Sequence, residues 1–188
     1  MGKSDQGIVA SAGRYTAIPR VLVFVFHGND VLLLKGAPAK RIWANRYNGV
    51  GGHVEADEDV YAAARRETRE ETGLEVHDLR LRGIVNVEVG APGDGSRSSD
   101  ASESGDSPQV GILFFVFTAR SAKRQTLPSA EGTLEWISLQ RLPQHDMVED
   151  VPILLRRLAE TPDTAPPFFA RYFYDEGDRL HIAFAEPV

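Results

Sequence analysis

The sequence of 188 residues contains no cysteine, and its basic side chains are outnumbered by acidic ones. The lack of cysteine excludes disulfide bonds, catalytic thiolates and zinc sites with cysteine ligands. The formal net charge of −6 at pH 7 argues against binding to a nucleic-acid polymer, because such binding needs a basic surface that displaces phosphate counterions.

Long apolar segments are also missing. The longest apolar runs, at 21–26 and 111–117, fall far short of the roughly 20 residues that span a bilayer. Residues 1–13 are polar and small and lack the apolar core of a signal peptide. We therefore expect a cytoplasmic protein that makes no use of a membrane.

Two segments contain little that a core could bury. Residues 1–13 are expected to form a flexible arm. Residues 90–108 consist mainly of glycine, serine, aspartate and proline, a composition typical of a flexible loop. The sequence therefore predicts one domain over residues 14–188, with 90–108 as a flexible insertion between two strands.

The rest of the sequence is typical of an α/β fold. Helical periodicity predicts helices at 59–72 and 149–160. We expect Asp57 to cap the first helix and Gly73 to end it. Runs of β-branched and aromatic residues predict strands at 20–27, 31–35, 79–89, 110–120, 134–138, 168–174 and 179–185. This order of elements indicates a mixed β-sheet with helices packed on its faces.

The predicted helix 59–72 places acidic residues on its apolar side. On a helical wheel Glu67 and Glu71 share the side of Ala63 and Ala64, with Glu70 on its flank. Partial burial of several carboxylates without a counterion raises their pKa values or costs several kcal/mol. A hard divalent cation relieves this cost by taking oxygen ligands, so the helix predicts a site for Mg²⁺ or Mn²⁺.

A glycine-rich loop, Asn48-Gly49-Val50-Gly51-Gly52-His53, precedes this helix. Glycine allows a backbone to approach a ligand closely and to expose its carbonyl groups. The loop and the acidic helix together predict a pocket in which backbone oxygens and carboxylates share metal ions. We expect His53 to contact phosphate and not metal, because an oxygen-rich site does not need an imidazole ligand.

The spacing of these residues resembles the signature of the Nudix hydrolases, G-x5-E-x7-R-E-U-x-E-E-x-G-U. It departs from that signature only at Thr68, where the family normally has an aliphatic residue. The matching residues are Gly52, Glu58, Arg66, Glu67, Glu70, Glu71, Gly73 and Leu74. The resemblance implies a Nudix-type α/β/α sandwich that hydrolyses a nucleoside diphosphate linked to another group with divalent cations.

The same resemblance implies roles for individual residues. Arg66 would orient a glutamate of the motif through a salt bridge, and Glu58 would brace the loop. The metal ligands would be Glu67, Glu70, Glu71 and a backbone carbonyl of Gly51 or Gly52. Of these, Glu67 and Glu70 would act in catalysis together with Arg66.

A narrower resemblance is to the MutT-like 8-oxo-dGTP diphosphatases. It implies that Glu131 is a further metal ligand or the general base, and that Asn48 and Asp150 contact the edge of a purine. Two departures are Val148, in place of a stacking tryptophan, and Val151, in place of a second acid. The segments that match are 46–53, 131–136, 142–143, 146–150 and the predicted C-terminal aromatic hairpin. We expect the substrate to be a nucleoside triphosphate, such as 8-oxo-dGTP, cleaved to monophosphate and pyrophosphate.

Alternatives remain open for each of these residues and for the function. Asn48 could occupy a turn, Asp150 could cap the second helix, and Glu131 could be a charge on a loop. Trp43 and Tyr47 could stack on a base or only cover the sheet. The chain could also hydrolyse ADP-ribose or a dinucleoside polyphosphate, or bind a nucleotide as a non-catalytic regulator.

Overall fold

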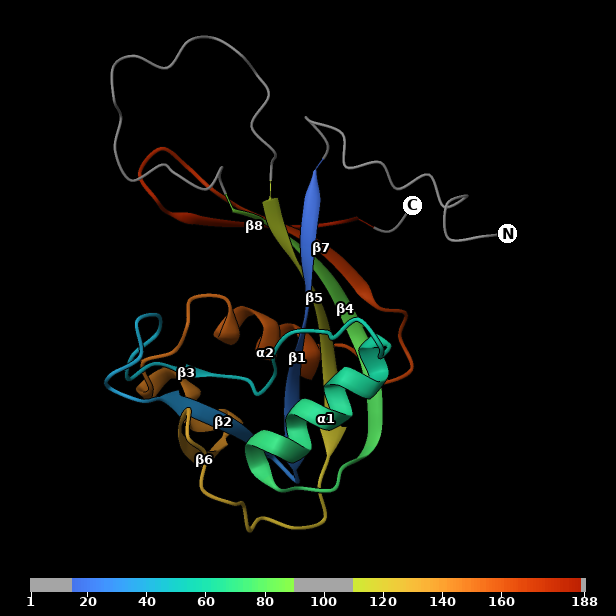
Figure 1. The fold of residues 1–188 in the computed structure, drawn as a ribbon, viewed down its shortest axis with the longest axis vertical. Coiled ribbons are helices and arrows are strands. Elements are labelled where there is room, and N and C mark those ends of the chain that lie inside the picture. The colour runs from blue at the N-terminus through green and yellow to red at the C-terminus, as the bar shows by residue number, and fades with distance from the viewer. Residues whose placement is uncertain (1–14, 90–109, 187–188) are drawn as a thin grey trace, which may run out of the picture.

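The computed structural model describes residues 15–89 and 110–186, so the predicted arm at 1–13 and insertion at 90–108 lie outside the described residues. Figure 1 shows the elements in chain order. They are β1 (Thr16–His27), β2 (Asp30–Gly36), β3 (Tyr47–Asn48), α1 (Val60–Thr72), β4 (His77–Val89), β5 (Val110–Arg120), β6 (Gly132–Ser138), a 3-10 helix (Leu139–Gln144), α2 (Val151–Glu160), β7 (Phe168–Tyr174) and β8 (Leu180–Phe184).

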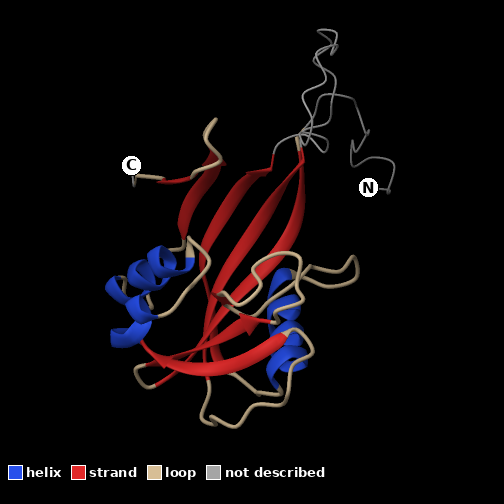
Figure 2. Ribbon diagram, turned by 90° about the vertical axis from the view of Figure 1, so that its left-hand side faces the viewer, coloured by secondary structure: helices blue, strands red, loops and turns tan. Residues whose placement is uncertain are grey.

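The two helices lie on opposite faces of the sheet (Figure 2). Strand β1 explains this arrangement, because its continuous apolar sequence is buried on both sides. Leu22 and Phe24 pack into the core cluster that contains residues of α2. Val23 and Val25, which alternate with them, pack into the cluster that contains residues of α1. The α/β/α sandwich inferred from the sequence is therefore the observed fold.

The sheet is mixed, as predicted. Its strands follow the order β3-β2-β1-β5-β4-β7-β8, and β6 pairs with β2. The pairs β1–β5 and β4–β7 are parallel, and the others are antiparallel. Strand β2 pairs with β3 through Leu34 and Asn48, and with β6 through Lys35 and Thr133. The loops next to these three strands therefore meet at one edge of the sheet.

The first helix begins later than predicted, and its cap is a different residue. Asp59 occupies the N-cap position, where one carboxylate oxygen accepts hydrogen bonds from the Tyr61 and Ala62 amides at 2.8 and 2.9 Å. The prediction that Asp57 caps this helix is wrong, because Asp57 lies two residues before that position. Gly73 ends the helix as expected, in a left-handed conformation with φ of 72°.

The remaining differences concern short or terminal structure. Strand β1 begins four residues before its predicted start, β4 and β6 each begin two residues before theirs, and α2 begins two residues after its predicted start. The two-residue strand β3 and the 3-10 helix were not predicted. Their segments are too short for a periodic pattern to be recognisable.

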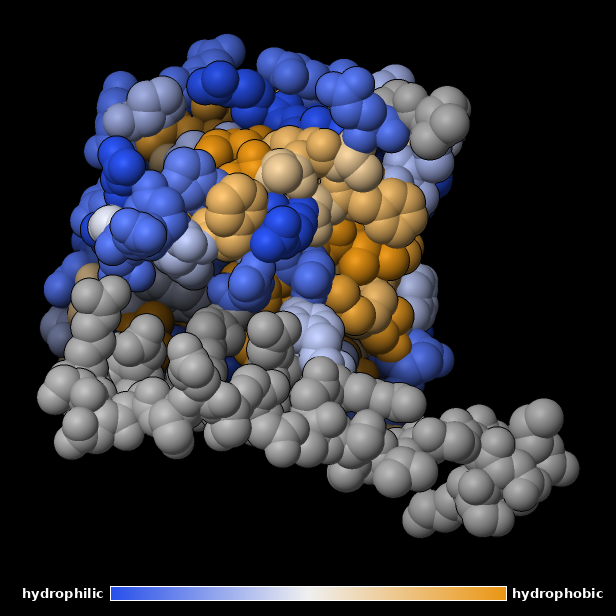
Figure 3. Space-filling view, turned by 90° about the horizontal axis from the view of Figure 1, so that it is seen from above, coloured by the Kyte–Doolittle hydropathy of each residue, from blue (hydrophilic) through white to orange (hydrophobic). Residues whose placement is uncertain are grey.

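The end of the molecule seen from above carries a concentration of apolar side chains. Seen from above, hydrophobic residues gather on this end of the molecule and are bordered by hydrophilic ones (Figure 3). Among the residues that the structure describes, no helix is long and apolar enough to cross a membrane.

Candidate active site

The guanidinium group of Arg66 connects helix α1 to the loop that precedes it. It donates to Glu58 at 2.5 Å, to Glu67 at 2.9 Å, to Glu70 at 3.1 Å and to the His53 carbonyl at 3.1 Å. These bonds lower the pKa of the Glu58 carboxyl below its usual value, chiefly through the hydrogen bond from Arg66. Arg66 therefore fixes the positions of two acids of the helix relative to the loop.

Glu71 lies deeper than the other acids of α1. One of its carboxylate oxygens accepts a hydrogen bond of 2.9 Å from the Gly51 amide. The pKa of Glu71 is raised to about 7, chiefly by burial and also by the negative charges of Glu131 and Glu67, while the Gly51 amide and Lys40 oppose the shift. More negative than positive charge is therefore gathered around this carboxyl.

The glycine loop lies directly against β1 and α1. The Gly52 carbonyl accepts from the Val21 amide at 2.9 Å, and Gly51 adopts a φ of 147°. A side chain at Gly51 would lie 2.1 Å from the Val21 carbonyl oxygen, and one at Gly52 would lie 2.4 Å from the Glu67 carboxylate. Only glycine at these two positions allows the backbone to lie against the acidic face of α1.

Glu131 reaches the same place from a distant part of the sequence. Its carboxylate is 2.6 Å from the Lys40 ammonium, and its carbonyl accepts from the Ala37 amide at 2.9 Å. Both Glu131 and Lys40 influence the pKa of Glu71, so both lie within electrostatic range of it. The structure therefore brings Glu131 to the acids of α1, as the narrower resemblance implied.

The donor set suits a hard divalent cation. All candidate ligands are oxygens, which Mg²⁺ and Mn²⁺ prefer, and the partly buried Glu71 lies among excess negative charge. Across 15–89 and 110–186, no three acidic or histidine side chains are already close enough to hold a metal ion. Donors of this chain contact each of the candidate carboxylates: Arg66 bonds to Glu67 and Glu70, Lys40 to Glu131, and the Gly51 amide to Glu71.

A second group of predicted residues lies at the other end of the glycine loop. The Tyr47 amide donates to the Asp146 carbonyl at 2.9 Å, and the Val148 amide donates to the Tyr47 carbonyl at 3.0 Å. The segment before α2 therefore runs alongside β3. Asn48, next to Tyr47, and Asp150, two residues after Val148, therefore lie on adjacent segments.

The side chains of these two residues differ in their surroundings. Asn48 accepts a hydrogen bond of 2.8 Å from the Gly49 amide, so it does stabilise the turn into the glycine loop. Asp150 occupies the N-cap position of α2, but its side chain makes no capping hydrogen bond. Burial raises the pKa of Asp150 to about 6, an unusual value for a carboxyl whose role is only to stand at the start of a helix.

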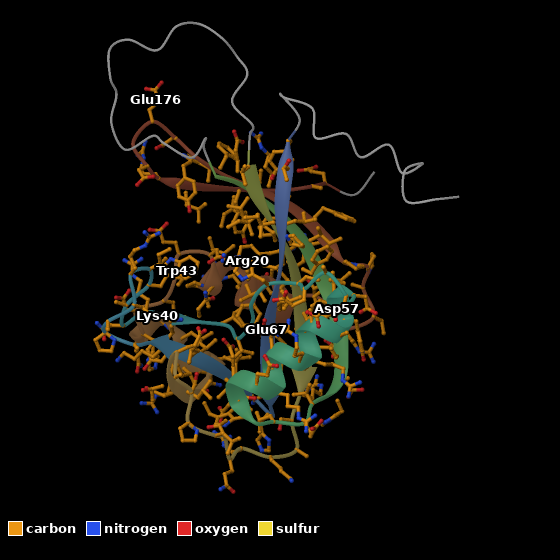
Figure 4. The ribbon with its side chains drawn as sticks, viewed as in Figure 1. Arg20, Lys40, Trp43, Asp57, Glu67 and Glu176 are labelled. Atoms are coloured by element: carbon orange, nitrogen blue, oxygen red, sulfur yellow. The ribbon has the colours of Figure 1, made fainter. Side chains whose placement is uncertain are left out.

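The side chains of Tyr47, Trp43 and His53 differ in their exposure and in what they contact. The Tyr47 ring is only 5 % exposed and packs edge-on against His145, so it covers the sheet. The Trp43 ring is 42 % exposed, on the same loop as Lys40 (Figure 4). His53 contacts the Arg20 guanidinium, with 2.9 Å between His53 Nε2 and an Arg20 nitrogen. Arg20 was not predicted, because an arginine beginning an apolar strand carries no signal of its own.

Comparison with known proteins agrees with this geometry. The NUDIX domain family matches residues 16–158. This chain belongs to the Nudix family. Like its relatives it is a Nudix pyrophosphohydrolase, and it is similar to the oxidized purine nucleoside triphosphate hydrolase of Mus musculus, with 30 % identity over 141 residues, 72 % of this chain and 78 % of the relative.

A second relative and a solved structure are also similar to this Nudix hydrolase. The oxidized purine nucleoside triphosphate hydrolase of Danio rerio is 26 % identical over 147 residues, which are 76 % of this chain and 83 % of the relative. The crystal structure of the MutT protein from Bacillus halodurans superposes with a TM-score of 0.68, covering 90 % of this chain and 99 % of that chain. Its sequence identity is 21 %, so this likeness concerns the fold.

Proposed function

We propose that this Nudix hydrolase cleaves a nucleoside triphosphate to monophosphate and pyrophosphate with Mg²⁺, and that it prefers an oxidised purine nucleotide such as 8-oxo-dGTP. The reaction is supported above all by helix α1, which places Glu67, Glu70 and Glu71 beside the glycine loop. The choice of substrate is supported by the similarity to two oxidized purine nucleoside triphosphate hydrolases.

The cation would be held by carboxylates of α1 and a backbone carbonyl. The Gly51 carbonyl suits this better than that of Gly52, because the Gly52 carbonyl already accepts from β1. Mn²⁺ could take the same oxygens. When bound, such a cation offsets charge on phosphate oxygens and lowers the pKa of the attacking water. The carboxylate ligands would be Glu67, Glu70 and Glu71, with Glu131 as a possible addition.

The residues of the chain then position the reactants. Water attacks one phosphorus, its proton passes to a carboxylate, and the bond to the leaving pyrophosphate breaks with the electron pair on the leaving oxygen. Glu70 and Glu131 are the candidates for this base, since both are half-exposed or more. Arg66 keeps Glu70 and Glu67 oriented, and His53 with Arg20 would face the phosphates.

The nucleotide would extend from this site towards Asn48 and Asp150. An amide and a carboxyl together offer donors and acceptors to the edge of a base. Trp43 is exposed enough to stack on a base, whereas the burial of Tyr47 favours the alternative that its ring only covers the sheet. The buried Val148 offers no aromatic face, so we expect a broader range of substrates than its relatives have.

The reaction is tested by assays with 8-oxo-dGTP, dGTP, ADP-ribose and a dinucleoside polyphosphate, with Mg²⁺ or with EDTA. We expect release of pyrophosphate from 8-oxo-dGTP that depends on Mg²⁺. Glu70→Gln should reduce turnover by two orders of magnitude or more, while Glu75→Gln, whose carboxylate is 74 % exposed, serves as the matched control. Near-normal turnover of Glu70→Gln at saturating Mg²⁺ would contradict the assignment of the site.

The substrate preference is tested separately. A site that hydrogen-bonds to a base rejects bases with the wrong donor pattern, since its own polar groups are then unpaired. Asn48→Ala and Asp150→Ala should each reduce the preference for 8-oxo-dGTP over dGTP by roughly 5- to 150-fold. Equal kcat/KM values for the two nucleotides in the unmodified chain would overturn the preference for oxidised purines but leave the reaction intact.

A further inference from the structure

The hydroxyl group of Tyr172, on β7, makes no hydrogen bond within the described part of the protein. Its side chain is 3 % exposed, and the residue pairs with Val87 of β4 and Ile182 of β8. Within residues 15–89 and 110–186, the Tyr172 hydroxyl is the buried side-chain polar group that has no hydrogen-bond partner. Buried polar groups are nearly always paired in folded proteins, because an unpaired one loses its bonds to water without replacement.

A structural reason for a tyrosine at this position is hard to find. The ring packs in the core cluster that contains Val148 and Val151, and phenylalanine would fill the same space. Phenylalanine would also avoid burying an unpaired hydroxyl. The tyrosine therefore makes the free protein less stable than it could be, and such a cost is typical of groups that serve binding.

The hydroxyl lies near the residues proposed to contact the base. The charge of Asp150 raises the pKa of Tyr172, so the two side chains are within electrostatic range of each other. Asp150 immediately precedes α2, and the first residue of that helix, Val151, shares the core cluster of Tyr172. Asp150 and Tyr172 thus lie on the α2 side of the sheet, and neither side chain makes a hydrogen bond that caps the helix.

We propose that the Tyr172 hydroxyl is a substrate-binding group that hydrogen-bonds to the edge of the substrate's base beside Asp150. This inference rests on the proposed function, since it assigns a contact to the same nucleotide. A hydroxyl can donate to a carbonyl oxygen and accept from an N–H group. It therefore suits purines whose oxidation has exchanged a ring acceptor for a donor, and it tolerates the unoxidised base as well.

The test compares Tyr172→Phe with a control, Tyr61→Phe. Tyr61 is 48 % exposed on α1, on the opposite face of the sheet from α2, and packs edge-on against Phe117. We expect Tyr172→Phe to raise the Tm of the metal-free protein and to lower kcat/KM for 8-oxo-dGTP at least fivefold. The control should change kcat/KM less than twofold, and inorganic tripolyphosphate, which has no base, should not distinguish the two variants.

A binding measurement makes the test independent of hydrolysis. Isothermal titration with 8-oxo-dGMP in EDTA should show at least fivefold weaker binding to Tyr172→Phe than to the unmodified chain. Deoxyribose 5-phosphate, the matching ligand without a base, should bind both proteins equally.

The outcomes separate this inference from the function on which it rests. A lower Tm for Tyr172→Phe would mean that the hydroxyl is paired within the fold, and would overturn the proposal. A loss of less than fivefold in both kcat/KM and binding would also overturn it. If the unmodified chain hydrolyses none of the nucleotides, the proposed function is wrong. The affinities of the unmodified chain and of Tyr172→Phe for 8-oxo-dGMP then test by themselves whether the hydroxyl contacts the base.

Discussion

The carboxyl of Glu71 is partly buried between the Gly51 amide and neighbouring acids, and its pKa is raised from 4.5 to about 7. A carboxyl whose pKa is raised by folding destabilises the folded state once it ionises. This cost is absent at pH values well below 4.5, grows as the pH rises, and is complete above about pH 7. By contrast, Asp59 stabilises α1 by capping its first amides, so acids near the two ends of this helix have opposite effects on stability.

We therefore predict that Glu71→Gln stabilises the metal-free protein in a manner that depends on pH. In EDTA its free energy of unfolding should exceed that of the unmodified chain by an amount on the order of 1–3 kcal/mol at pH 8, and by much less at pH 5. Urea denaturation at both pH values measures this difference, with Glu75→Gln expected to stay within about 0.5 kcal/mol.

Addition of Mg²⁺ completes this test. A cation that binds only the folded state stabilises it by mass action. Mg²⁺ should therefore raise the stability of the unmodified chain at pH 8 and have little effect on Glu71→Gln. A variant that is less stable than the unmodified chain at pH 8 in EDTA would show that the carboxylate of Glu71 is structural.

At the scale of elements, one face of helix α1 serves both the fold and the site. Ala63 and Ala64 are fully buried against the sheet, and Thr68 is buried as well, with its hydroxyl donating to the Ala64 carbonyl at 2.7 Å. That local bond explains how a threonine replaces the aliphatic residue usual in the family. Glu67 and Glu71 lie on this same side of the helix, between the directions of Ala63 and Ala64.

The contribution of the N-cap of α1 to stability can be tested at Asp59, with Asp57 as the control. Asp59→Ala removes an N-cap that accepts two amide hydrogen bonds, and should cost about 1 kcal/mol of unfolding free energy. Asp57→Ala removes a similar charge two residues earlier, outside the cap, and should cost about 0.3 kcal/mol or less. Chemical denaturation measures the free energy of unfolding of both variants. Equal decreases would mean that the negative charge near the helix, and not the capping hydrogen bond, stabilises it.

At the scale of the whole molecule, the order of strands in the sheet determines which loops meet. Strand β2 pairs with both β3 and β6, so the loop containing Lys40 lies beside the turn containing Glu131. The pair β4–β5 similarly brings together the ends of the predicted insertion. Val89 and Val110 are partners in this antiparallel pair, although 20 residues separate them.

This pairing allows the segment between β4 and β5 to be tested by replacement. A two-residue Asn-Gly turn is a common way to join antiparallel partners such as Val89 and Val110. Because residues 90–108 contain little that could offset the entropy of ordering them, we predict that the replacement leaves the Tm and kcat/KM almost unchanged. Thermal denaturation and steady-state kinetics check this, and a tenfold increase in KM would instead assign the segment to substrate binding.

The sequence by itself determined those features that depend on neighbours along the chain. The acids of α1 could be placed on one face because a period of 3.6 residues sets their directions before any packing is known. The bounds of β5 and β7 were predicted without error, because alternating β-branched and aromatic residues end in clear turns. The motif, and hence the Nudix family, follows from the same local spacing.

Only the tertiary structure decided the features that join distant residues. The pairing of Lys40 with Glu131 spans 91 residues, and the contact of Arg20 with His53 spans 33. Neither has a local pattern, because strand order and register bring the partners together. The burial of Tyr47 and the unpaired hydroxyl of Tyr172 likewise depend on what packs around each ring. Local periodicity determines which way a side chain points, whereas its neighbours are determined by the path of the whole chain.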